Sequence, residues 1–209
     1  GSDERPGMNH PIPANETQRL AALRSYSILD TDPEVAYDEI TELAAHFCDC
    51  PVAVIGLIDE TRDWKKSKYG LPPNFTALPR EISICSATIC GNDMLFVPDL
   101  TRDDRFHDNP VVTGQPHLRM YCGMPLINPE GHALGTLCIV DFKPRQLSFE
   151  QTEALRRLSH QVVSQLELRR SLLELDRRMR DLERMNEEIA AERDKVDRLL
   201  RNVLPESIA

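Results

Sequence analysis

The sequence has no long apolar run and no excess of basic charge. None of its 209 residues belongs to a stretch of about 18 apolar residues, and the amino terminus lacks the apolar core of a signal peptide. Its 25 Lys and Arg stand against 34 Asp and Glu, a formal net charge of -9. A surface that binds nucleic acid needs a basic stripe. We therefore expect a cytoplasmic protein, with neither membrane nor nucleic acid as a partner of this segment.

The cysteines are few and lack the pattern of a disulfide framework. The six are Cys48, Cys50, Cys85, Cys90, Cys122 and Cys138. A chain with 41% hydrophobic residues has no need of cross-links at this length, so we expect free thiols. His46, Cys48 and Cys50 are possible zinc ligands, but alternate residues of a helix point about 200° apart and do not converge. The sequence predicts neither a metal site nor a cofactor.

Apolar periodicity and turn residues divide the first 147 residues into short elements. Two helices are expected before residue 51. The apolar face of the second is Ile40, Leu43, Ala44 and Phe47. The run "VAVIGLID", Val52–Asp59, fits a central strand buried on both faces. The patterns then predict a polar strand over Asp63–Tyr69, a short helix over Ile82–Gly91 and a strand over Met94–Val97. A long loop over Asp103–Pro116 and a hairpin over Met120–Val140 follow.

From Ser148 onward the sequence reads as one long helix. Ser148 and Gln151 form a capping box, and no helix breaker follows before Pro205. Residues at alternating steps of four and three define what we term the heptad seam. Its members are Leu168, Leu172, Leu175, Met179, Leu182, Asn186, Ile189, Arg193, Val196, Leu200 and Val203. This spacing is typical of a coiled coil.

The heptad seam predicts a homodimer of parallel helices. Asn186 occupies an a position, where two facing asparagines can hydrogen-bond across a parallel pair in register. Arg193 at the next a position weakens the seam, so a small change at one end can shift the pair. The alternative is a single solvated helix. Upstream, Leu155, Leu158, Val162 and Leu166 form a separate stripe that we expect to pack on the globular domain.

The order of elements and two segments resemble a GAF domain. The segments are "VPDLTRDDRFHDNP" and "YCGMPLINPEGHALGTLCIVDFKPRQLS", and the resemblance covers about Asn15 to Leu166. It implies an α+β fold, in which an antiparallel sheet is flanked by helices and carries a ligand-sized pocket, followed by the long coiled-coil helix. The expected organisation is a leader or tag over residues 1–13, a GAF domain over 14–166, a signalling helix over 167–204 and a linker beginning at 205–209.

The end of the chain carries a second resemblance. "LLRNVLPESIA", Leu199–Ala209, is similar to the segment that precedes the catalytic domain of class III nucleotide cyclases. In those enzymes the active sites form between two chains, which a parallel coiled coil would align. The resemblance implies that an adenylate or guanylate cyclase domain follows, and that this segment itself is not an enzyme.

The GAF resemblance also indicates where a small ligand would bind. By family position the candidate residues are Cys85, Thr88, Asp99, Phe106, Tyr121 and Thr136. For each of them ordinary packing is the alternative, and Asp99 could instead cap the helical turn after Thr101. The Asn-Lys pair of GAF domains that bind cyclic nucleotides is absent, because Asp93 follows Asn92. None of the cysteines is followed by His, as the attachment cysteine of bilin-binding relatives commonly is.

These patterns predict a regulatory module that dimerises and passes a ligand or redox signal to a cyclase. The first alternative is a thiol-dependent redox sensor, or an enzyme like the GAF-fold methionine sulfoxide reductases, with Cys85, Cys90 and Cys122 near one another. A further alternative keeps the sensor and replaces the cyclase by a histidine kinase or a diguanylate cyclase.

Overall fold

The computed structural model describes residues 11–203, and it divides between Glu167 and Leu168 into two compact units. The expected linker at 205–209, the helix-stopping Pro205 and most of the expected leader lie outside the described residues. Among the residues that are described, none of the helices has both the length and the apolarity that a bilayer span requires.

The first unit is built on a six-stranded antiparallel sheet with the order β3-β2-β1-β6-β5-β4. The strands are β1 (Val52–Ile58), β2 (Arg62–Tyr69), β3 (Ala77–Pro79), β4 (Leu95–Val97), β5 (Met120–Ile127) and β6 (Ala133–Asp141). The expected fold class is confirmed. Strand β1 is buried along its whole length and pairs with β2 and β6, which is the central place that its apolar run predicts.

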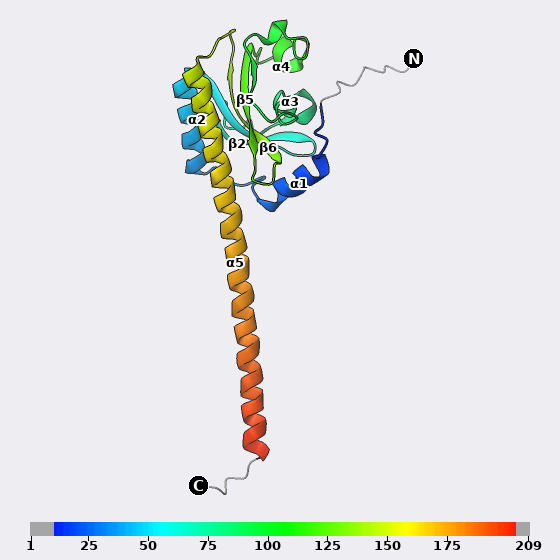
Figure 1. The fold of residues 1–209 in the computed structure, drawn as a ribbon, viewed down its shortest axis with the longest axis vertical. Coiled ribbons are helices and arrows are strands. Elements are labelled where there is room, and N and C mark those ends of the chain that lie inside the picture. The colour runs from blue at the N-terminus through cyan, green and yellow to red at the C-terminus, as the bar shows by residue number, and fades with distance from the viewer. Residues whose placement is uncertain (1–10, 204–209) are drawn as a thin grey trace, which may run out of the picture. The chain divides into compact units, whose positions relative to one another are not determined.

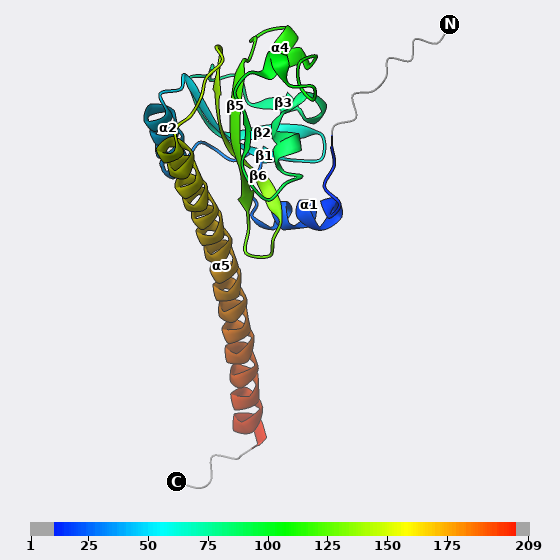
Figure 2. The same cartoon turned by 45° about the horizontal axis from the view of Figure 1, so that its top comes forward.

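Helices cover one face of this sheet and enclose the larger core. They are α2 (Val35–Cys48) and the first part of α5 (Phe149–Val203), and α1 (Glu16–Ser25) adds Leu23 to the same core. Figures 1 and 2 show α2 and the start of α5 on the same side of the sheet. Because side chains alternate along a strand, Ile55 of β1 and Ile139 of β6 belong to this core, together with Leu155, Val162 and Leu166 of α5. The expected packing of the upstream leucine stripe is confirmed, with Leu158 partly buried at its edge.

The expected apolar face of α2 is wrong at two of its four positions. Ile40 and Ala44 are buried, but Leu43 and Phe47 are each 57% exposed. The buried face continues instead through Tyr37, Thr41, Ala45 and Cys48. Thr41 is tolerated there because its hydroxyl hydrogen-bonds to Ser67 Oγ at 2.9 Å. The prediction counted apolar residues only, so it did not identify a polar residue that is buried because β2 offers it a hydrogen-bond partner.

The opposite face of the sheet carries short helices and loops around a second core. These helices are α3 (Cys85–Thr88), α4 (Pro110–Thr113) and the 3-10 turns Arg80–Ile82 and Leu100–Arg102. Val52 and Val54 of β1, Tyr121 of β5 and Val140 of β6 point into this second core. Figure 2 shows α4 and β3 on this side. The sheet therefore separates two cores, and its strands contribute side chains to both.

Buried charges attach α1 to the rest of the first unit. Glu16 Oε2 accepts from Arg19 Nε at 2.8 Å, and Glu16 Oε1 accepts from Arg80 Nη1 at 2.6 Å. Arg19 Nη1 also donates to the carbonyl of Ala133 in β6. Burial alone would raise the pKa of Glu16, but the hydrogen bonds and charges of both arginines outweigh it and lower the pKa to about 2. Glu16 with its two arginines is termed the Glu16 cluster.

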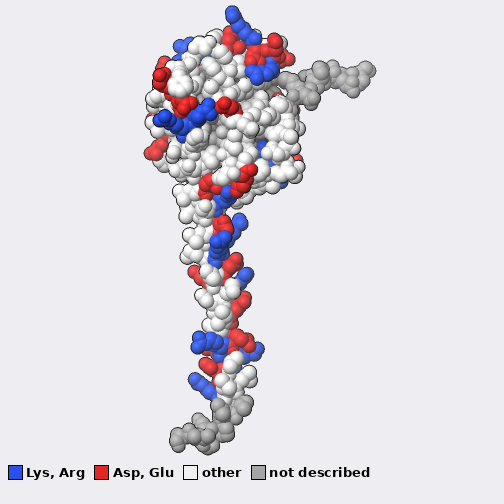
Figure 3. Space-filling model, in the orientation of Figure 1, with Lys and Arg blue, Asp and Glu red and all other residues white. Residues whose placement is uncertain are grey.

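The long helix α5 begins with the expected capping box. The backbone N–H of Ser148 donates to Gln151 Oε1 at 3.0 Å, and the N–H of Gln151 donates to Ser148 Oγ at 3.2 Å. The second unit contains the part of α5 from Leu168 onward. There the apolar side chains of the heptad seam from Leu168 to Leu200 are 46% to 59% exposed. Acidic and basic side chains alternate along the same stretch (Figure 3).

Candidate functional site

A cavity of about 420 Å³ lies on the face of the sheet that carries the second core. Its floor comes from strands β1, β2, β5 and β6, and its walls come from the loop after β2 and the segments around α3 and α4. The lining is mostly apolar and includes Val54, Leu78, Ile84, Leu118 and Val140. The volume lies within the range of roughly 300–1,000 Å³ that is usual for small-molecule sites.

The floor of the cavity holds a buried ion pair. Lys65 Nζ lies 2.6 Å from Asp63 Oδ2, and the two side chains are 6% and 1% exposed. Ser83 Oγ donates to the same carboxylate oxygen at 2.6 Å. Burial alone would lower the pKa of Lys65, but the charge of Asp63, the neighbouring Cys85 and Cys138 and the hydrogen bond with Asp63 together outweigh burial and raise it. Lys65 therefore stays protonated in an apolar surrounding.

The backbone of β1 and β2 creates the space for this pair. Asp63 and Lys65 are two residues apart and so point to the same face of β2. A register shift in the β1–β2 pairing follows, so that Gly56 lies opposite Lys65 while Ile55 lies opposite Ser67. A Cβ on Gly56 would lie 2.4 Å from Asp63 Oδ1. Only glycine leaves room there for the carboxylate.

One oxygen of the ion pair is left over. Within the part of the chain that the structure describes, Asp63 Oδ1 is buried and accepts no hydrogen bond. An unpaired buried acceptor costs about 1–3 kcal/mol. A donor on a ligand in the cavity would remove that cost, because Asp63 is one of the residues that line it.

Two thiols and a phenol complete the polar part of the floor. Cys85 Sγ and Cys138 Sγ are 3.9 Å apart, and Tyr121 O–H donates to Cys85 Sγ at 3.4 Å. The hydroxyl of Thr88 lies 2.7 Å from the Tyr121 hydroxyl. Burial raises the pKa of Tyr121 well above its usual value, which keeps the phenol protonated and able to donate.

The two thiols differ in acidity although they touch. The hydrogen bond from Cys138 lowers the pKa of Cys85, and the Lys65 ammonium lowers it further. Burial and the Asp63 carboxylate oppose this shift but do not cancel it. The same contact, with burial, raises the pKa of Cys138 well above the usual thiol value. Cys85 is thus the thiol that ionises first, with Cys138 donating to its thiolate.

The structure brings together some of the predicted ligand-binding residues and separates others. Cys85 and Tyr121 line the cavity, and Thr88 is buried directly behind Tyr121. Thr136 is fully buried on the same face of β6 as Cys138. Phe106 belongs to the second core but does not reach the cavity wall.

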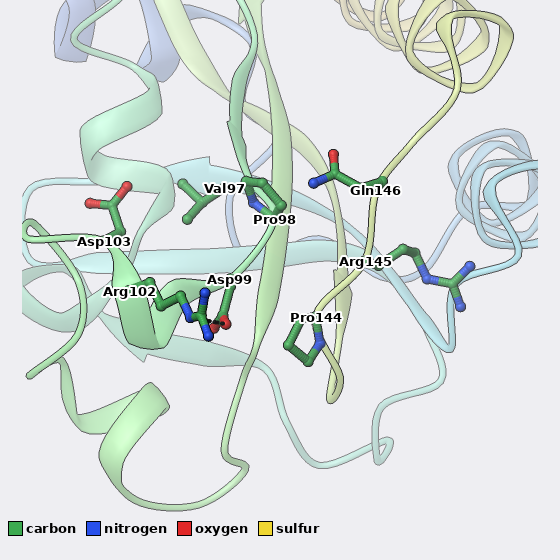
Figure 4. Close-up of a pocket in the computed structure, with 8 residues that line it drawn as sticks. All are labelled: Val97, Pro98, Asp99, Arg102, Asp103, Pro144, Arg145 and Gln146. Carbon is green, nitrogen blue, oxygen red and sulfur yellow. Dashed lines mark ion pairs between the residues drawn. The ribbon is translucent and has the colours of Figure 1, made fainter.

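Asp99 lies elsewhere, at a wide surface hollow of about 680 Å³ beside Pro98, Arg102 and Pro144 (Figure 4). Its Oδ1 accepts from the backbone N–H of Thr101 at 3.1 Å and from the Thr101 hydroxyl at 2.6 Å, and these bonds lower the pKa of Asp99. The carboxylate therefore caps the turn Leu100–Arg102, which is the alternative that the sequence left open. Asp99 does not line the 420 Å³ cavity, and its part in ligand binding stays a prediction.

This hollow is a weaker candidate than the cavity although it is larger. Arg102 is paired with Asp99, as Figure 4 shows, and the Arg145 guanidinium points away from the hollow toward Asp141, whose Oδ2 lies 2.8 Å from Arg145 Nε. Its charged groups are thus already paired, and the hollow is open to water. We therefore place the candidate site in the 420 Å³ cavity.

The expected grouping of thiols is also corrected. Cys122 belongs to the core under the helices, on the far side of the sheet from Cys85, because it is next to Tyr121 in β5. Cys90 is exposed. The partner of Cys85 is Cys138 instead. In residues 11–203, no three His, Cys, Asp or Glu side chains converge as metal ligands.

Sequence reasoning missed Asp63, Lys65, Ser83 and Cys138. The first two carried a usable signal, because two opposite charges at a spacing of two residues in a strand must share a face. Ser83 and Cys138 carried none, since their positions follow from the docking of the segment before α3 on β6.

Comparison with known proteins gives the family. A family model described as GAF domain matches residues 32–166. The chain belongs to the GAF domain family. A second model, described as heme NO binding associated, matches residues 154–209, which include the segment with cyclase resemblance.

A curated relative of this GAF protein is a cyclic di-GMP phosphodiesterase of Pseudomonas aeruginosa. The two are 37% identical over 135 residues, which are 65% of this chain and 23% of the relative. The chain thus spans less than a quarter of the relative's length. The relative is not a class III cyclase, so the expected cyclase output does not follow from it.

Solved structures share the GAF fold at low identity. The GAF domain of an Acinetobacter phosphoenolpyruvate-protein phosphotransferase matches with a TM-score of 0.54 at 16% identity, over 75% of this chain and 95% of that one. A type II free methionine-R-sulfoxide reductase from Thermoplasma acidophilum matches with a TM-score of 0.50 at 12% identity, over 63% and 92%. At these identities the likeness concerns the fold alone.

Proposed function

We propose that this GAF protein is a sensor that binds a small neutral molecule in the 420 Å³ cavity and passes the bound state, through a parallel homodimeric coiled coil, to a cyclase domain. The observation that carries the proposal is the row of exposed apolar side chains at heptad spacing on α5, a helix whose first part packs in the core of the sensor unit.

The lining of the cavity favours a neutral ligand with a hydrogen-bond donor. Lys65 and Asp63 are its charged residues, and they neutralise each other. The phosphate of a cyclic nucleotide would find no uncompensated cation there, and burying an unpaired charge is costly. Asp63 Oδ1 offers an acceptor for a hydroxyl or amine, and the apolar walls fit a hydrocarbon or aromatic body.

Strand β6 offers a route from the cavity to α5. Cys138 and Val140 line the cavity, while their neighbours Leu137 and Ile139 pack in the core that also holds Leu155 of α5. A ligand that displaces β6 changes the surroundings of both faces at once, because packed cores shift between discrete arrangements rather than deform smoothly.

One pair of charges beside the heptad seam and one polar seam residue support parallel pairing. Arg178 occupies a g position, and Glu183 occupies the e position five residues later, so the two attract each other across a parallel dimer in register. Asn186 at an a position favours the same arrangement. In a single chain the seam leucines stay about half exposed, which a second copy would relieve.

One observation supports a cyclase as output: the segment Leu199–Ala209 resembles the one that precedes class III cyclase domains. The Pseudomonas relative, by its name, hydrolyses a cyclic dinucleotide, so a phosphodiesterase is the competing output. The first output would form a cyclic nucleotide and the second would hydrolyse a cyclic dinucleotide.

The dimer is tested with Leu182→Asp in the chain of 209 residues. Truncating a buried leucine costs about 2–5 kcal/mol, and a dimer contains two, so we expect dissociation to become easier by at least about 10³-fold. Ala191→Asp adds the same charge at an outward f position and should leave the dimer intact. Analytical ultracentrifugation measures both. A parent chain that is monomeric at 100 µM, or whose spin-labelled tails run antiparallel, overturns the proposal.

The output is tested in the full-length gene product. We expect it to form cyclic AMP or cyclic GMP, and we expect Leu182→Asp to remove regulation while Ala191→Asp does not. Hydrolysis of cyclic di-GMP without cyclase activity would overturn the cyclase and leave the sensor standing.

The ligand class is tested with 1-naphthylamine, a neutral aromatic amine, and with naphthalene-1-sulfonate, its anionic counterpart. We expect only the amine to bind, and Leu71→Trp, which fills the cavity from its rim, to abolish binding. Leu43→Trp, on the exposed side of α2, is the matched control. Equal binding of both probes, or binding that survives Leu71→Trp, would count against the assignment.

A further inference from the structure

The contact between Cys85 and Cys138 has no role in the ligand binding or the dimerisation proposed above. Both thiols are buried from the outer surface, yet both line the cavity, so a small solute that enters the cavity reaches them. Their sulfur atoms are 3.9 Å apart, whereas those of a disulfide are about 2.05 Å apart. The two sulfur atoms therefore have to move about 2 Å closer to each other to form a disulfide bond.

The surroundings of Cys85 stabilise a thiolate. Its sulfur accepts a hydrogen bond from the Tyr121 hydroxyl at 3.4 Å, and the Cys138 sulfur lies 3.9 Å away, where its thiol can donate once Cys85 has lost its proton. The Lys65 ammonium lies on the same floor and lowers the pKa of Cys85. A thiolate, not a thiol, is the nucleophile in thiol oxidation.

We propose that Cys85 and Cys138 form a peroxide-reactive pair, in which Cys85 attacks the oxidant and Cys138 resolves the product as a disulfide across the cavity floor. The oxidant is hydrogen peroxide or a small organic hydroperoxide. Nothing in the proposed ligand binding or coiled coil requires this chemistry, so it is a separate input to the same cavity.

The steps balance with peroxide as the only co-reactant. The Cys85 thiolate attacks one peroxide oxygen and the O–O bond breaks, which gives a sulfenic acid and a hydroxide that takes up a proton to become water. The Cys138 thiol then loses its proton, its sulfur attacks Cys85 Sγ, and the sulfenic hydroxyl leaves as water. Two thiols lose two electrons in total, and one peroxide is reduced to two waters.

The bond would reshape the cavity. Cys138 is held in β6 by pairing with both β1 and β5, whereas Cys85 is the first residue of the four-residue helix α3. Most of the movement of about 2 Å therefore falls on α3, which is drawn toward the sheet. Oxidation narrows the cavity, so the disulfide form should bind the neutral probe less tightly.

The remaining cysteines supply internal controls. Cys90 is exposed, but burial of part of its side chain raises the pKa of its thiol. Cys122 lies in the other core, where burial raises its pKa to about 12. Exposure alone would favour Cys90 as the first site of oxidation, whereas thiolate stabilisation favours Cys85.

The experiment treats the reduced chain of 209 residues with hydrogen peroxide, followed by alkylation of free thiols, digestion and mass spectrometry. We expect a peptide linked through Cys85 and Cys138 to form at least tenfold faster than any oxidation of Cys90. Cys138→Ser should stop the reaction at the sulfenic acid, which dimedone traps on Cys85. Cys90→Ser should behave like the parent chain.

Preferred oxidation of Cys90, or a Cys138→Ser chain that folds by circular dichroism and forms no dimedone adduct, overturns the proposal. A second measurement covers the case in which a cysteine variant does not fold. The parent chain itself must lose affinity for 1-naphthylamine by at least fivefold after oxidation and regain it with dithiothreitol. The coiled coil is not involved, so the monomeric Leu182→Asp chain should form the same disulfide, and failure of the dimer would leave this result untouched.

Discussion

Replacing Lys65 by Met tests the buried ion pair on which the candidate site depends. The change keeps the length of the side chain and removes its charge. Asp63, 1% exposed, then keeps only the hydrogen bond from Ser83 Oγ. Removing one partner of a buried pair costs about 3–5 kcal/mol, because the remaining charge is left uncompensated. The hydrogen bond from Ser83 still stabilises the Asp63 carboxylate by about 1.5–3 kcal/mol, so we expect the cost of Lys65→Met to lie near the lower end of that 3–5 kcal/mol range.

The expected cost is large compared with a total stability of about 5–15 kcal/mol. At about 2–4 °C per kcal/mol for a unit of this size, Lys65→Met should lower Tm by about 6–12 °C for a cost of 3 kcal/mol. Urea unfolding followed by circular dichroism gives the free energy directly. Lys143→Met, at an exposed lysine after β6, is the control and should stay within about 0.5 kcal/mol of the parent.

The double variant Asp63→Asn/Lys65→Met separates the pair from the packing. Replacing both charges is often nearly neutral, so the double variant should recover at least about 2 kcal/mol of the single variant's loss. A Lys65→Met protein within about 1 kcal/mol of the parent, or a double variant no more stable than the single one, would contradict a stabilising role for the buried pair. Either result would mean that the pair is solvated through the cavity.

Three further predictions follow from single positions. Glu16→Gln should lower the free energy of unfolding by about 1–2 kcal/mol at pH 7, which is less than the full pKa shift of Glu16 would give, because the carboxylate is partly solvated. The variant should also lose less stability than the parent chain as the pH falls below 4.5. The sign follows from the lowered pKa: the stability is present above pH 4.5 and is lost as pH falls toward about 2, and urea unfolding from pH 7 to 2.5 measures it. Gly70→Ala should cost at least about 2 kcal/mol in the same assay, because the backbone φ of Gly70 is +76° and a Cβ there would lie 1.9 Å from the Pro51 carbonyl oxygen. Gly131 has a similar φ of +85°, but no atom lies within 4 Å of a Cβ built there, so Gly131→Ala should cost about 1 kcal/mol. Asn186→Leu should raise the Tm of the proposed dimer or shift it to larger assemblies, and an unchanged Tm and mass by light scattering would argue against a parallel seam at that position.

Local patterns predicted much of the fold. The apolar run of β1, the turn at Asn128–Gly131 between β5 and β6, and the Ser148–Gln151 capping box all appear as expected. Each is decided within a few residues, either by burial of both strand faces or by a side chain that bonds a nearby backbone group. For such elements the local sequence carries the whole physical cause.

The predictions that needed contacts between distant segments were less successful. Leu43 and Phe47 are as apolar as a buried face requires, but the docking of α2 on β2 turned Thr41 inward, where Ser67 satisfies its hydroxyl. The outcome for Asp99 was local instead, because Thr101, two residues later, donates two hydrogen bonds to its carboxylate and makes it a cap. In both cases a competing partner decided the outcome.

Periodicity and composition act along the chain, so the long helix with its heptad seam and the acidic character could be predicted from the sequence, and the resemblance to GAF domains indicated the fold class. The common cavity floor of Asp63, Lys65, Cys85 and Cys138 became visible in the folded protein alone. These residues come from two strands and a short helix, and nothing in their spacing relates Cys85 to a partner 53 positions later. The pairing of β1 with β2 and β6, and the absence of a side chain at Gly56, bring them within reach of one another.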